Sequence, residues 1–522
     1  MTTDKHGFLL GLFGLLSLCL NAADWPQDAG VGYGFTSGES SAPSEWSVSL
    51  DKNIVWRTTL PETGQSAPIL SGDRIFLTTM RPVHEDTNTG RDIIAYCLSK
   101  NCGSILWERE ILGSYATRMS GPFGDASSPA PVTDGKHVWF LNPTGRMVCF
   151  DMEGNEVWSQ AVTSVIRTRP LLYDGKIIFH KQVYLPNEEG KFTHGNKDAP
   201  LEKWTQLQAL DAKTGKVVWT STCGVNMGSV VMLQHLSDGK AVFVVGRGGG
   251  HGPPEKPQGI SMVSANNGKT HWTLPLEKFS ATQTFPIVDG IVLVFHQGEH
   301  LWVDAKSGKV TRSVSITEEV KVRKWTEDGF QTVPDKLKKG GRGITQQSNL
   351  RVGDYNYFRS YTRNYLGRIH IQSGEVEYLQ LPLQILREPG KPEKILWNAD
   401  HRKEELAKTK KKGLPNLLLR PNEVRNSRVF KVMGDGRSIA NGWGHTASIN
   451  PTAFGNRLFV PILCGLVFVI QADAKTLDES AVLGMNDLGT LGVAFTRASI
   501  TTDGKRIYAH TIKEVIAIGE RN

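Results

Sequence analysis

The feature that most limits the fold of this chain is a strand–turn–strand unit that recurs along it. The clearest copy is LQALDAKTGKVVW (207–219), in which an alternating apolar strand leads through an Asp-x-x-Thr-Gly turn into a strand ending at Trp219. Such alternation predicts a β-strand, and glycine readily adopts the positive φ that the turn requires. Related copies lie at 93–107, 147–158, 261–272 and 301–310, with degenerate ones at 368–376 and 467–477. A repeat architecture is therefore predicted.

A second hairpin falls between these copies. It consists of an apolar run, a turn with glycine, usually Asp-Gly, and another apolar strand, and the Asp-Gly turn is typical of a tight β-hairpin. Its eight copies lie at 67–78, 130–141, 169–180, 236–245, 285–296, 350–358, 450–460 and 500–510. Two hairpins together form a four-stranded antiparallel unit of roughly 50–60 residues.

A four-stranded antiparallel unit cannot bury both of its faces alone, whereas a radial arrangement lets each sheet cover the next. Eight copies predict an all-β, eight-bladed β-propeller of four-stranded antiparallel blades, and "NIVW" (53–56) is expected to supply the outer strand that closes the ring. Glycine at 54 of 522 residues fits a fold with many tight turns. An array of β-sandwiches is the alternative, but it would not require a tryptophan at the same point of each unit.

The N-terminus resembles a targeting segment. Residues 7–20 form an apolar run after Lys5 and before Ala22–Ala23, which predicts a signal peptide over 1–23 and a propeller over 24–522. An uncleaved anchor is the alternative, and Leu18 is too bulky for the lipoprotein pattern that Cys19 would suggest. We expect an exported protein of the periplasm or extracellular space, with no membrane span in the mature chain.

Cysteine and charge distribution add smaller expectations. Cys97 and Cys102 bracket a short turn and could bridge a hairpin in an oxidising compartment, or could stay free. The net charge of +8 is concentrated in a basic insertion at about 383–435, whose HRKEELAKTKKKG stretch (401–413) predicts a solvated helix. A nucleic-acid partner is not expected, because the basic residues are not interleaved with aromatic ones.

The unit AxDxxTGxxxW, complete at 209–219, resembles the tryptophan-docking motif of the pyrroloquinoline-quinone (PQQ)-like repeat propellers. That family includes quinoprotein dehydrogenases and the outer-membrane assembly scaffold BamB. The segments at 24–27, 45–61 and 441–470 resemble exported PQQ-like propeller proteins of planctomycete-type bacteria. The resemblance implies the fold strongly and the activity weakly, because one fold hosts many functions.

Candidate binding residues lie where loops enter the innermost strands and where the second strands end, which the resemblance places on one face around the central channel. Gln65, Asp125, Asn226, Gln283 and Gln347 share these positions with a set of cationic or imidazole side chains. That set is Arg167, Arg169, Arg247, His251, His296, Arg359, His445, Arg497 and His510. Together they predict a donor-lined funnel for an anionic or hydroxyl-rich ligand, with scattered surface histidines as the alternative. No metal site is predicted from local spacing.

The glycine-rich loop GRGGGHGPPEKPQG (246–259) invites a nucleotide-binding interpretation. It lacks the Gly-Lys-Ser/Thr ending of a phosphate loop, and Pro253–Pro254 oppose the helix that such a loop precedes. It is expected instead to join two strands of the fourth blade and to carry Arg247 and His251 toward the channel mouth.

Two functions follow from these expectations. The first is a non-catalytic exported propeller that binds or scaffolds a glycan, an anionic ligand or a protein partner. The second, implied by the resemblance, is an oxidoreductase acting on an alcohol or sugar with PQQ and calcium. In that case Asp125 would be the base, and Arg167, Arg169, Arg247 and Arg497 would pair with the carboxylates of the quinone. The adjacent cysteine pair of many such enzymes and a cytochrome motif are both missing from the sequence.

Overall fold

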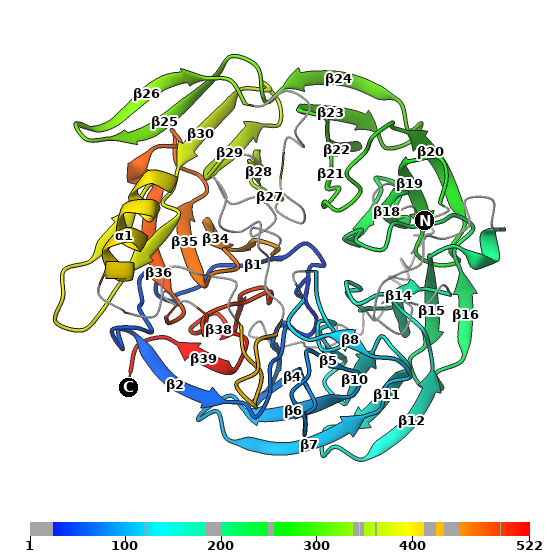
Figure 1. Cartoon of the computed structure of the whole chain (residues 1–522). Coiled ribbons are helices and arrows are strands. Elements are labelled where there is room, and N and C mark those ends of the chain that lie inside the picture. The colour runs from blue at the N-terminus through cyan, green and yellow to red at the C-terminus, as the bar shows by residue number, and fades with distance from the viewer. Residues whose placement is uncertain are drawn as a thin grey trace, which may run out of the picture.

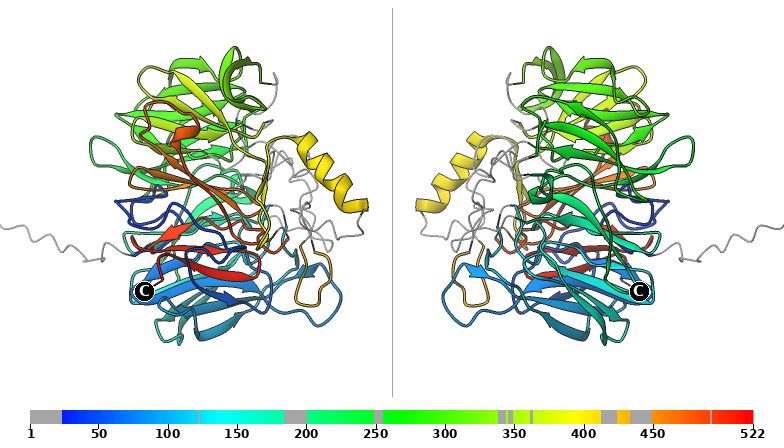
Figure 2. Two further views of the ribbon diagram at one scale, coloured as in Figure 1. Left: turned by 90° about the vertical axis from the view of Figure 1, so that its left-hand side faces the viewer. Right: turned by 90° about the vertical axis from the view of Figure 1, so that its right-hand side faces the viewer.

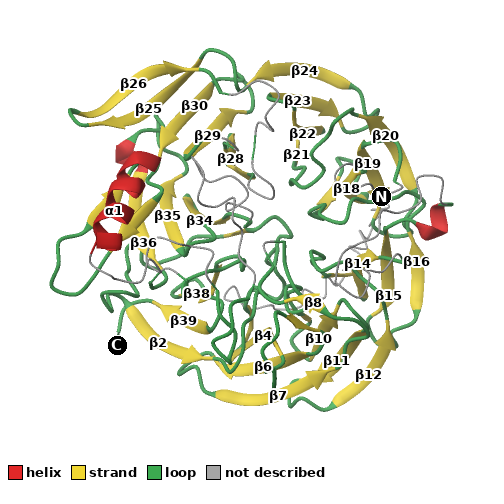
Figure 3. Cartoon of the chain, viewed as in Figure 1, coloured by secondary structure: helices red, strands yellow, loops and turns green. Residues whose placement is uncertain are grey.

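A computed structural model describes residues 24–121, 123–183, 200–248, 255–337, 344, 349–360, 363–411, 424–432, 449–490 and 492–521. Eight antiparallel sheets stand radially around a central axis (Figure 1). The predicted eight-bladed β-propeller is confirmed. Figure 3 shows strands throughout the ring together with the helix α1 (Ala399–Lys411). The described residues also include the short helical segments η1 (Leu201–Lys203) and η5 (Glu479–Ala481).

The first four blades follow one another along the chain, and the strands of each blade are named in order from the innermost to the outermost. Blade 1 is β3 (Ile69–Ser71), β4 (Arg74–Met80), β6 (Ile93–Ser99) and β7 (Ile105–Ile111). Blade 2 is β9 (Val132–Thr133), β10 (His137–Asn142), β11 (Arg146–Asp151) and β12 (Glu156–Ala161). Blade 3 is β13 (Leu171–Tyr173), β14 (Lys176–Lys181), β15 (Gln206–Asp211) and β16 (Val217–Thr220). Blade 4 is β17 (Leu233–His235), β18 (Ala241–Arg247), β19 (Gly259–Ser264) and β20 (Thr270–Pro275).

The remaining four blades complete the ring. Blade 5 is β21 (Ile287–Val288), β22 (Ile291–His296), β23 (Glu299–Asp304) and β24 (Val310–Ser315). Blade 6 is β27 (Leu350–Val352), β28 (Tyr355–Arg359), β29 (Tyr365–His370) and β30 (Val376–Gln380). Blade 7 is β33 (Thr452–Phe454), β34 (Arg457–Pro461), β35 (Leu466–Gln471) and β36 (Val482–Asp487). Blade 8 is β37 (Thr501–Thr502), β38 (Ile507–His510), β39 (Glu514–Ile518) and β2 (Ile54–Thr59).

The two ends of the described chain meet in blade 8 and close the ring. β2 pairs antiparallel with β39, so that Arg57 lies opposite Ile516. The outer strand predicted at 53–56 is therefore confirmed, and it extends to Thr59. Pairing of the first blade-forming strand with the last one makes the fold depend on contacts between residues almost the whole chain apart.

Neighbouring blades are joined by the repeated tryptophan. The indole Nε1 of Trp158 on β12 donates to the Ala212 carbonyl in the outer turn of blade 3, at 2.9 Å. A Cβ atom added to Gly215 of that turn would lie 2.8 Å from the Trp158 ring, and the φ of Gly215 is +70°. Trp56, Trp107 and Trp272 make the same kind of bond to Lys100, Met152 and Ala305 of their next blades. The sequence motif thus marks the contact between blades.

Blade 5 departs from this pattern. Its outer strand carries Arg312 at the position that tryptophan has in blades 1 to 4 and 8, and the guanidinium donates to the carbonyls of Gln372 and Ser373 in blade 6. The same guanidinium lies 4.5 Å from the Trp302 ring centroid. An arginine stacked on an aromatic ring therefore replaces both the flat surface and the donor of the missing indole.

The segment 24–37 crosses the inside of the ring, where β1 (Thr36–Ser37) is visible in Figure 1. Trp25 pairs with Leu70 of blade 1, the Pro26 carbonyl accepts from Thr133 of blade 2, and Gln27 accepts from Leu172 of blade 3. β1 then pairs parallel with β33 of blade 7. The described N-terminal segment therefore ties the innermost strands of four blades together.

Two additions depart from the plain ring. Part of the segment 317–343 forms β25 (Val320–Thr326) and β26 (Gly329–Asp335), and β25 extends blade 6 by pairing parallel with β30. The expected basic insertion, at 383–435, is described at 383–411 and 424–432. It opens with β31 (Gln384–Leu386) and β32 (Lys394–Leu396), followed by the expected helix, α1. Figure 2 shows α1 standing out from one face of the ring.

The second described part of the insertion, 424–432, returns to the ring between blades 8 and 1. The Ser427 hydroxyl donates to buried Glu62 at 2.5 Å, and Lys513 donates to the Asn426 carbonyl at 3.0 Å. Within the described ranges, no helix has both the length and the apolar character needed to cross a bilayer.

The five cysteines of the described chain are all free. Burial within β6 raises the pKa of the Cys97 thiol to about 12, whereas hydrogen bonds with Ser104 and Ser99 lower the pKa of exposed Cys102 to about 7. The bridge considered between these two residues is not formed in this structure.

Candidate functional site

Most polar residues that precede the innermost strands fasten those strands to their neighbours. Gln283 donates to the Phe295 carbonyl and accepts from the Phe295 amide, both at 2.8 Å. The hydroxyls of Thr168 and Ser229 accept from the amides of His180 and Gly246. These side chains provide hydrogen-bond partners for backbone amide and carbonyl groups near the ends of the second strands. Polarity at these positions is therefore largely structural.

A pocket nevertheless forms where the entry loops of blades 1, 2, 3 and 8 meet. Its lining includes Arg167, Arg169, Arg497, Gln65 and Phe123, together with Asp28 from the crossing N-terminal segment. Its volume of about 30 Å³ leaves space for a single small group. Three arginines and one aspartate give the described lining an excess of positive charge. We call this the axial pocket.

Two of its arginines are fixed by contacts within the propeller. Arg167 stacks on Phe123, with the guanidinium carbon 4.1 Å from the ring centroid, and its Nη1 atom would lie 2.8 Å from a Cβ added to Gly228. Arg169 forms an ion pair with buried Asp28 and donates to the Ser499 hydroxyl at 3.4 Å. The loops of separate blades thus hold rigid guanidinium groups in one place.

The aspartate expected to act as a base lies beside this pocket and is wholly buried. The Asp125 carboxylate accepts from the Ser127 hydroxyl at 2.6 Å, from the Ser127 amide at 2.9 Å and from the Ser120 amide at 2.8 Å. Burial raises the pKa of Asp125, against the lowering effect of these bonds and of the Arg497 charge. Asp125 therefore shapes a loop: both of its oxygens accept hydrogen bonds from that loop, and it is not among the residues that line the pocket.

Arg247 does not reach the axial pocket. Its side chain is 5% exposed and donates to the carbonyls of Lys256 and Pro257 and to the hydroxyls of Ser261 and Thr273. Such a set of bonds ties the described end of the glycine-rich loop to blade 4. The expected position of Arg247 at the channel mouth is therefore not what the structure shows.

Of the remaining candidates on the second strands, Arg359 and His510 are packed between blades and His296 is partly covered by a loop. Arg359 is fully buried and donates to the carbonyls of Pro461 and Ile449, and burial lowers its pKa to about 9. His510 is 1% exposed with its Nδ1 atom 2.7 Å from the Ser66 carbonyl, and burial lowers its pKa to about 4. His296 is half-buried against Phe279, and burial lowers its pKa too. These side chains do not join the arginines of the axial pocket.

His251, His445 and Gln347, together with the central part of the glycine-rich loop, lie outside the described residues. Of the nine predicted binding residues, the structure brings Arg167, Arg169 and Arg497 together. Sequence reasoning missed Asp28 and Phe123, because neither lies at a repeat position. The only sequence signal for Asp28 is the "DWPQ" stretch immediately before it.

PQQ with its calcium ion needs more space and more oxygen ligands than the described residues of the axial pocket provide. The volume of the pocket is too small for a tricyclic quinone, and the described part of the chain holds no group of three His, Cys, Asp or Glu side chains able to bind a metal ion. Calcium requires six to eight oxygen ligands, several of them usually carboxylates. The described residues therefore fit a single anionic group and do not fit the quinone with its calcium.

Comparisons with known proteins agree with the architecture. A family model described as outer membrane protein assembly factor BamB matches residues 91–208 and 199–332. The sequence has no significant match among curated proteins. Among solved structures, the quinohemoprotein alcohol dehydrogenase of Comamonas testosteroni is 12% identical with a TM-score of 0.51, covering 97% of this chain and 82% of that one. A europium-containing methanol dehydrogenase is 12% identical with a TM-score of 0.50, covering 95% of this chain and 90% of that one. At such identities the likeness shows the fold alone.

Proposed function

Because the chain belongs to the PQQ-like β-propeller family, we propose that it is an exported, non-catalytic binding protein. Its axial pocket would hold one anionic group, a carboxylate or a phosphate, of a small ligand or of a protein partner. The proposal of export rests on the apolar segment 7–20 and the small residues that follow it.

The convergence of Arg167, Arg169 and Arg497 in one pocket carries this proposal. Guanidinium groups offer paired donors that match the oxygens of carboxylates and phosphates. Stacking on Phe123 and the contact at Gly228 hold Arg167 in place before any ligand arrives. A pre-positioned group loses little conformational freedom on binding, which favours affinity.

A non-catalytic role is supported by the positions of three described residues that could have taken part in catalysis, none of which lines the axial pocket. Asp125 is buried with both oxygens engaged, and His510 and Arg359 are packed between blades. The matching family model is described as an assembly factor, which also supports a binding role. The alternative, a PQQ- and calcium-dependent oxidoreductase, has the arginines in its favour but neither the space nor the described metal ligands.

Calorimetric titration of the purified protein with inorganic phosphate, acetate and succinate would test the proposal. We expect one of these anions to bind, and Arg497→Ala to weaken that binding at least about tenfold, as loss of a charge-assisted hydrogen bond would. The exposed Arg351 provides the matched control, since Arg351→Ala removes an arginine of β27 away from the pocket.

Failure of all three anions to bind, or equal losses from Arg497→Ala and Arg351→Ala, would contradict the proposal. A titration with PQQ and calcium belongs in the same series. Turnover of an alcohol by the loaded protein would favour the oxidoreductase instead.

A further inference from the structure

A second cavity, distinct from the axial pocket, lies at the outer edge of blade 7. It runs between the N-terminal segment 45–52, β36, the tip of the β25–β26 hairpin and the β31–β32 hairpin. Its volume of about 470 Å³ falls in the range of small-molecule sites, which is about 300–1,000 Å³. It shares no lining residue with the axial pocket. We call it the edge groove.

Aromatic rings form one wall of the edge groove. Trp397 and Phe330 both line it and are half-buried, with ring centroids 5.3 Å apart in an edge-to-face contact. Trp325 stacks behind Trp397 at 5.6 Å with the two planes only 5° apart. Because the stacked ring behind it fixes its orientation, Trp397 offers a firm flat surface to the groove.

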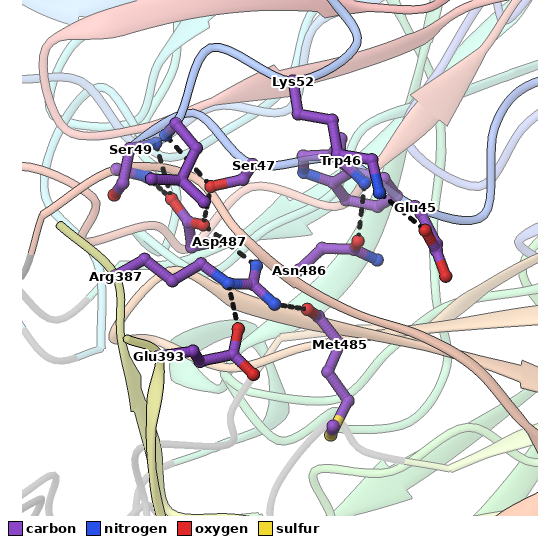
Figure 4. A network of polar contacts seen from close by, with 12 residues as sticks. Glu45, Trp46, Ser47, Ser49, Lys52, Arg387, Glu393, Met485, Asn486 and Asp487 are labelled. Atoms are coloured by element: carbon purple, nitrogen blue, oxygen red, sulfur yellow. Dashed lines mark hydrogen bonds and ion pairs between the residues drawn. The ribbon is translucent and has the colours of Figure 1, made fainter. Parts of the chain in front are cut away.

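The charged side chains of the groove are paired with one another (Figure 4). Arg387 binds Glu393, Asp487 behind the groove and the Met485 carbonyl. Lys52 pairs with Glu45 of the same segment at 2.7 Å. Glu479, which also lines the groove, pairs with Arg323. An ionic ligand would have to displace one of these partners. A neutral ligand with hydroxyl groups can instead bond to the outer sides of the same carboxylates and guanidinium.

The strand beneath the groove is closed to a peptide. β36 is the outermost strand of blade 7, and an open strand edge would suit an added β-strand. Here Arg387 donates to the Met485 carbonyl and the Val48 amide donates to the Asp487 carbonyl. The side-chain amide of Asn486 accepts from the Trp46 amide and donates to the Ser44 carbonyl, which holds the segment 44–48 against the strand. Two backbone carbonyls of this edge are therefore already bonded, which favours recognition by side chains.

The groove places flat aromatic rings beside charged side chains that are already paired with one another. Such a surface suits a neutral ligand that has an apolar face and hydroxyl groups along its edge. A pyranose ring has this character, because its axial C–H bonds form an apolar face and its hydroxyls lie around the rim. We propose that the edge groove binds a neutral oligosaccharide, with a sugar ring on Trp397 and Phe330 and its hydroxyls bonded to Arg387, Glu393 and Glu45.

Titration with neutral trisaccharides tests this proposal, using cellotriose, maltotriose, xylotriose and chitotriose and following tryptophan fluorescence and heat. We expect at least one to bind the full chain. Trp397→Ala and, separately, Phe330→Ala should each weaken it about tenfold or more, as is typical of an aromatic anchor in a binding site. Phe430→Ala is the matched control, because Phe430 is 38% exposed and lies outside the groove.

Arg497→Ala should leave sugar binding unchanged, which separates this site from the axial pocket. Thermal unfolding of each variant shows that it is folded, and Phe330→Ala gives an independent test of the aromatic wall if Trp397→Ala proves unstable. The proposal is overturned if none of the four sugars binds at millimolar concentration, if both groove variants bind as tightly as wild type, or if charged trigalacturonate binds more tightly than every neutral sugar.

Discussion

Among the described residues, three histidines are wholly buried inside the ring, namely His180, His300 and His510. Burial lowers their pKa values to about 4, about 3 and about 4, and each keeps one ring nitrogen without a partner among the described residues. The end of a second strand looks like a ligand position in the sequence, because polar residues there interrupt an apolar run. The alternation of a strand does not reveal that its neighbouring blade covers that side chain. The sequence therefore singled out His510 but predicted it at the rim of the channel, whereas the structure buries it between two blades.

These histidines make stability depend on pH. Near pH 6.5 the unfolded chain takes up a proton on each of them, whereas the folded chain does so only near pH 4. The free energy of unfolding is therefore fully present above pH 6.5 and falls as the pH drops toward 4. We expect each histidine to account for a loss of about 2 kcal/mol between pH 7.5 and pH 5.

Urea unfolding of wild type and His510→Gln at pH 7.5 and pH 5 measures this effect. The variant should lose about 2 kcal/mol less than wild type on acidification. His235→Gln, at an exposed position of β17, is the control and should behave as wild type. An unchanged acid loss in His510→Gln would mean that this histidine is protonated in the folded chain.

At the scale of the element, the unit that recurs in the sequence is the unit that joins blade to blade. In blades 1 to 5 the glycine of the outer turn lies under the tryptophan of the preceding blade, as Gly215 lies under Trp158. The residue pattern was sufficient to predict the strands and turns, since both depend on local residues. It did not predict Arg312 in place of tryptophan, or the addition of β25 to blade 6, because β30 follows some fifty residues later in the chain.

Blade 3 separates the two roles of such a glycine. Gly175 and Gly215 have φ values of +67° and +70°, but an added Cβ meets nothing at Gly175 and the Trp158 ring at Gly215. Gly175→Ala should cost about 1–2 kcal/mol through backbone strain alone. Gly215→Ala should cost about 1–3 kcal/mol more, since the ring must move. Chemical unfolding of both variants measures the difference, and equal losses would show that the tryptophan does not rest on the turn.

At the scale of the whole molecule, the N-terminal segment does more than lead into the first blade. Trp25 and Phe35 are buried to 1% and 0% exposure, and between them the chain passes from blade 1 to blade 7 across the ring. Nothing in the repeat predicts this path, because the segment carries no repeat of its own. The candidate site was only partly predictable for the same reason: three arginines come from the repeats, and the carboxylate that meets them, Asp28, comes from outside them.

The Asp28 carboxylate connects the N-terminal segment that crosses the ring to the proposed anion-binding site. Asp28 is 3% exposed and pairs with Arg169, so it occupies a guanidinium that an anionic ligand would otherwise use. Asp28→Asn removes the negative charge that competes with the ligand, and Arg169 loses its ion pair with Asp28. We therefore expect the variant to bind the anion found by titration about tenfold more tightly, and to unfold more easily by about 3–5 kcal/mol when no ligand is present.

Tighter anion binding and lower stability both result from the loss of the Asp28 charge, so the same variant should show both. Added anion should recover part of the lost thermal stability in Asp28→Asn, because binding to the folded state stabilises it by mass action. Asp24→Asn is the matched control, since Asp24 belongs to the same segment but caps the Gly72 amide at another cavity. A variant that loses stability yet binds anions no better than wild type would show that Asp28 serves the ring alone and that Arg169 takes no part in the site.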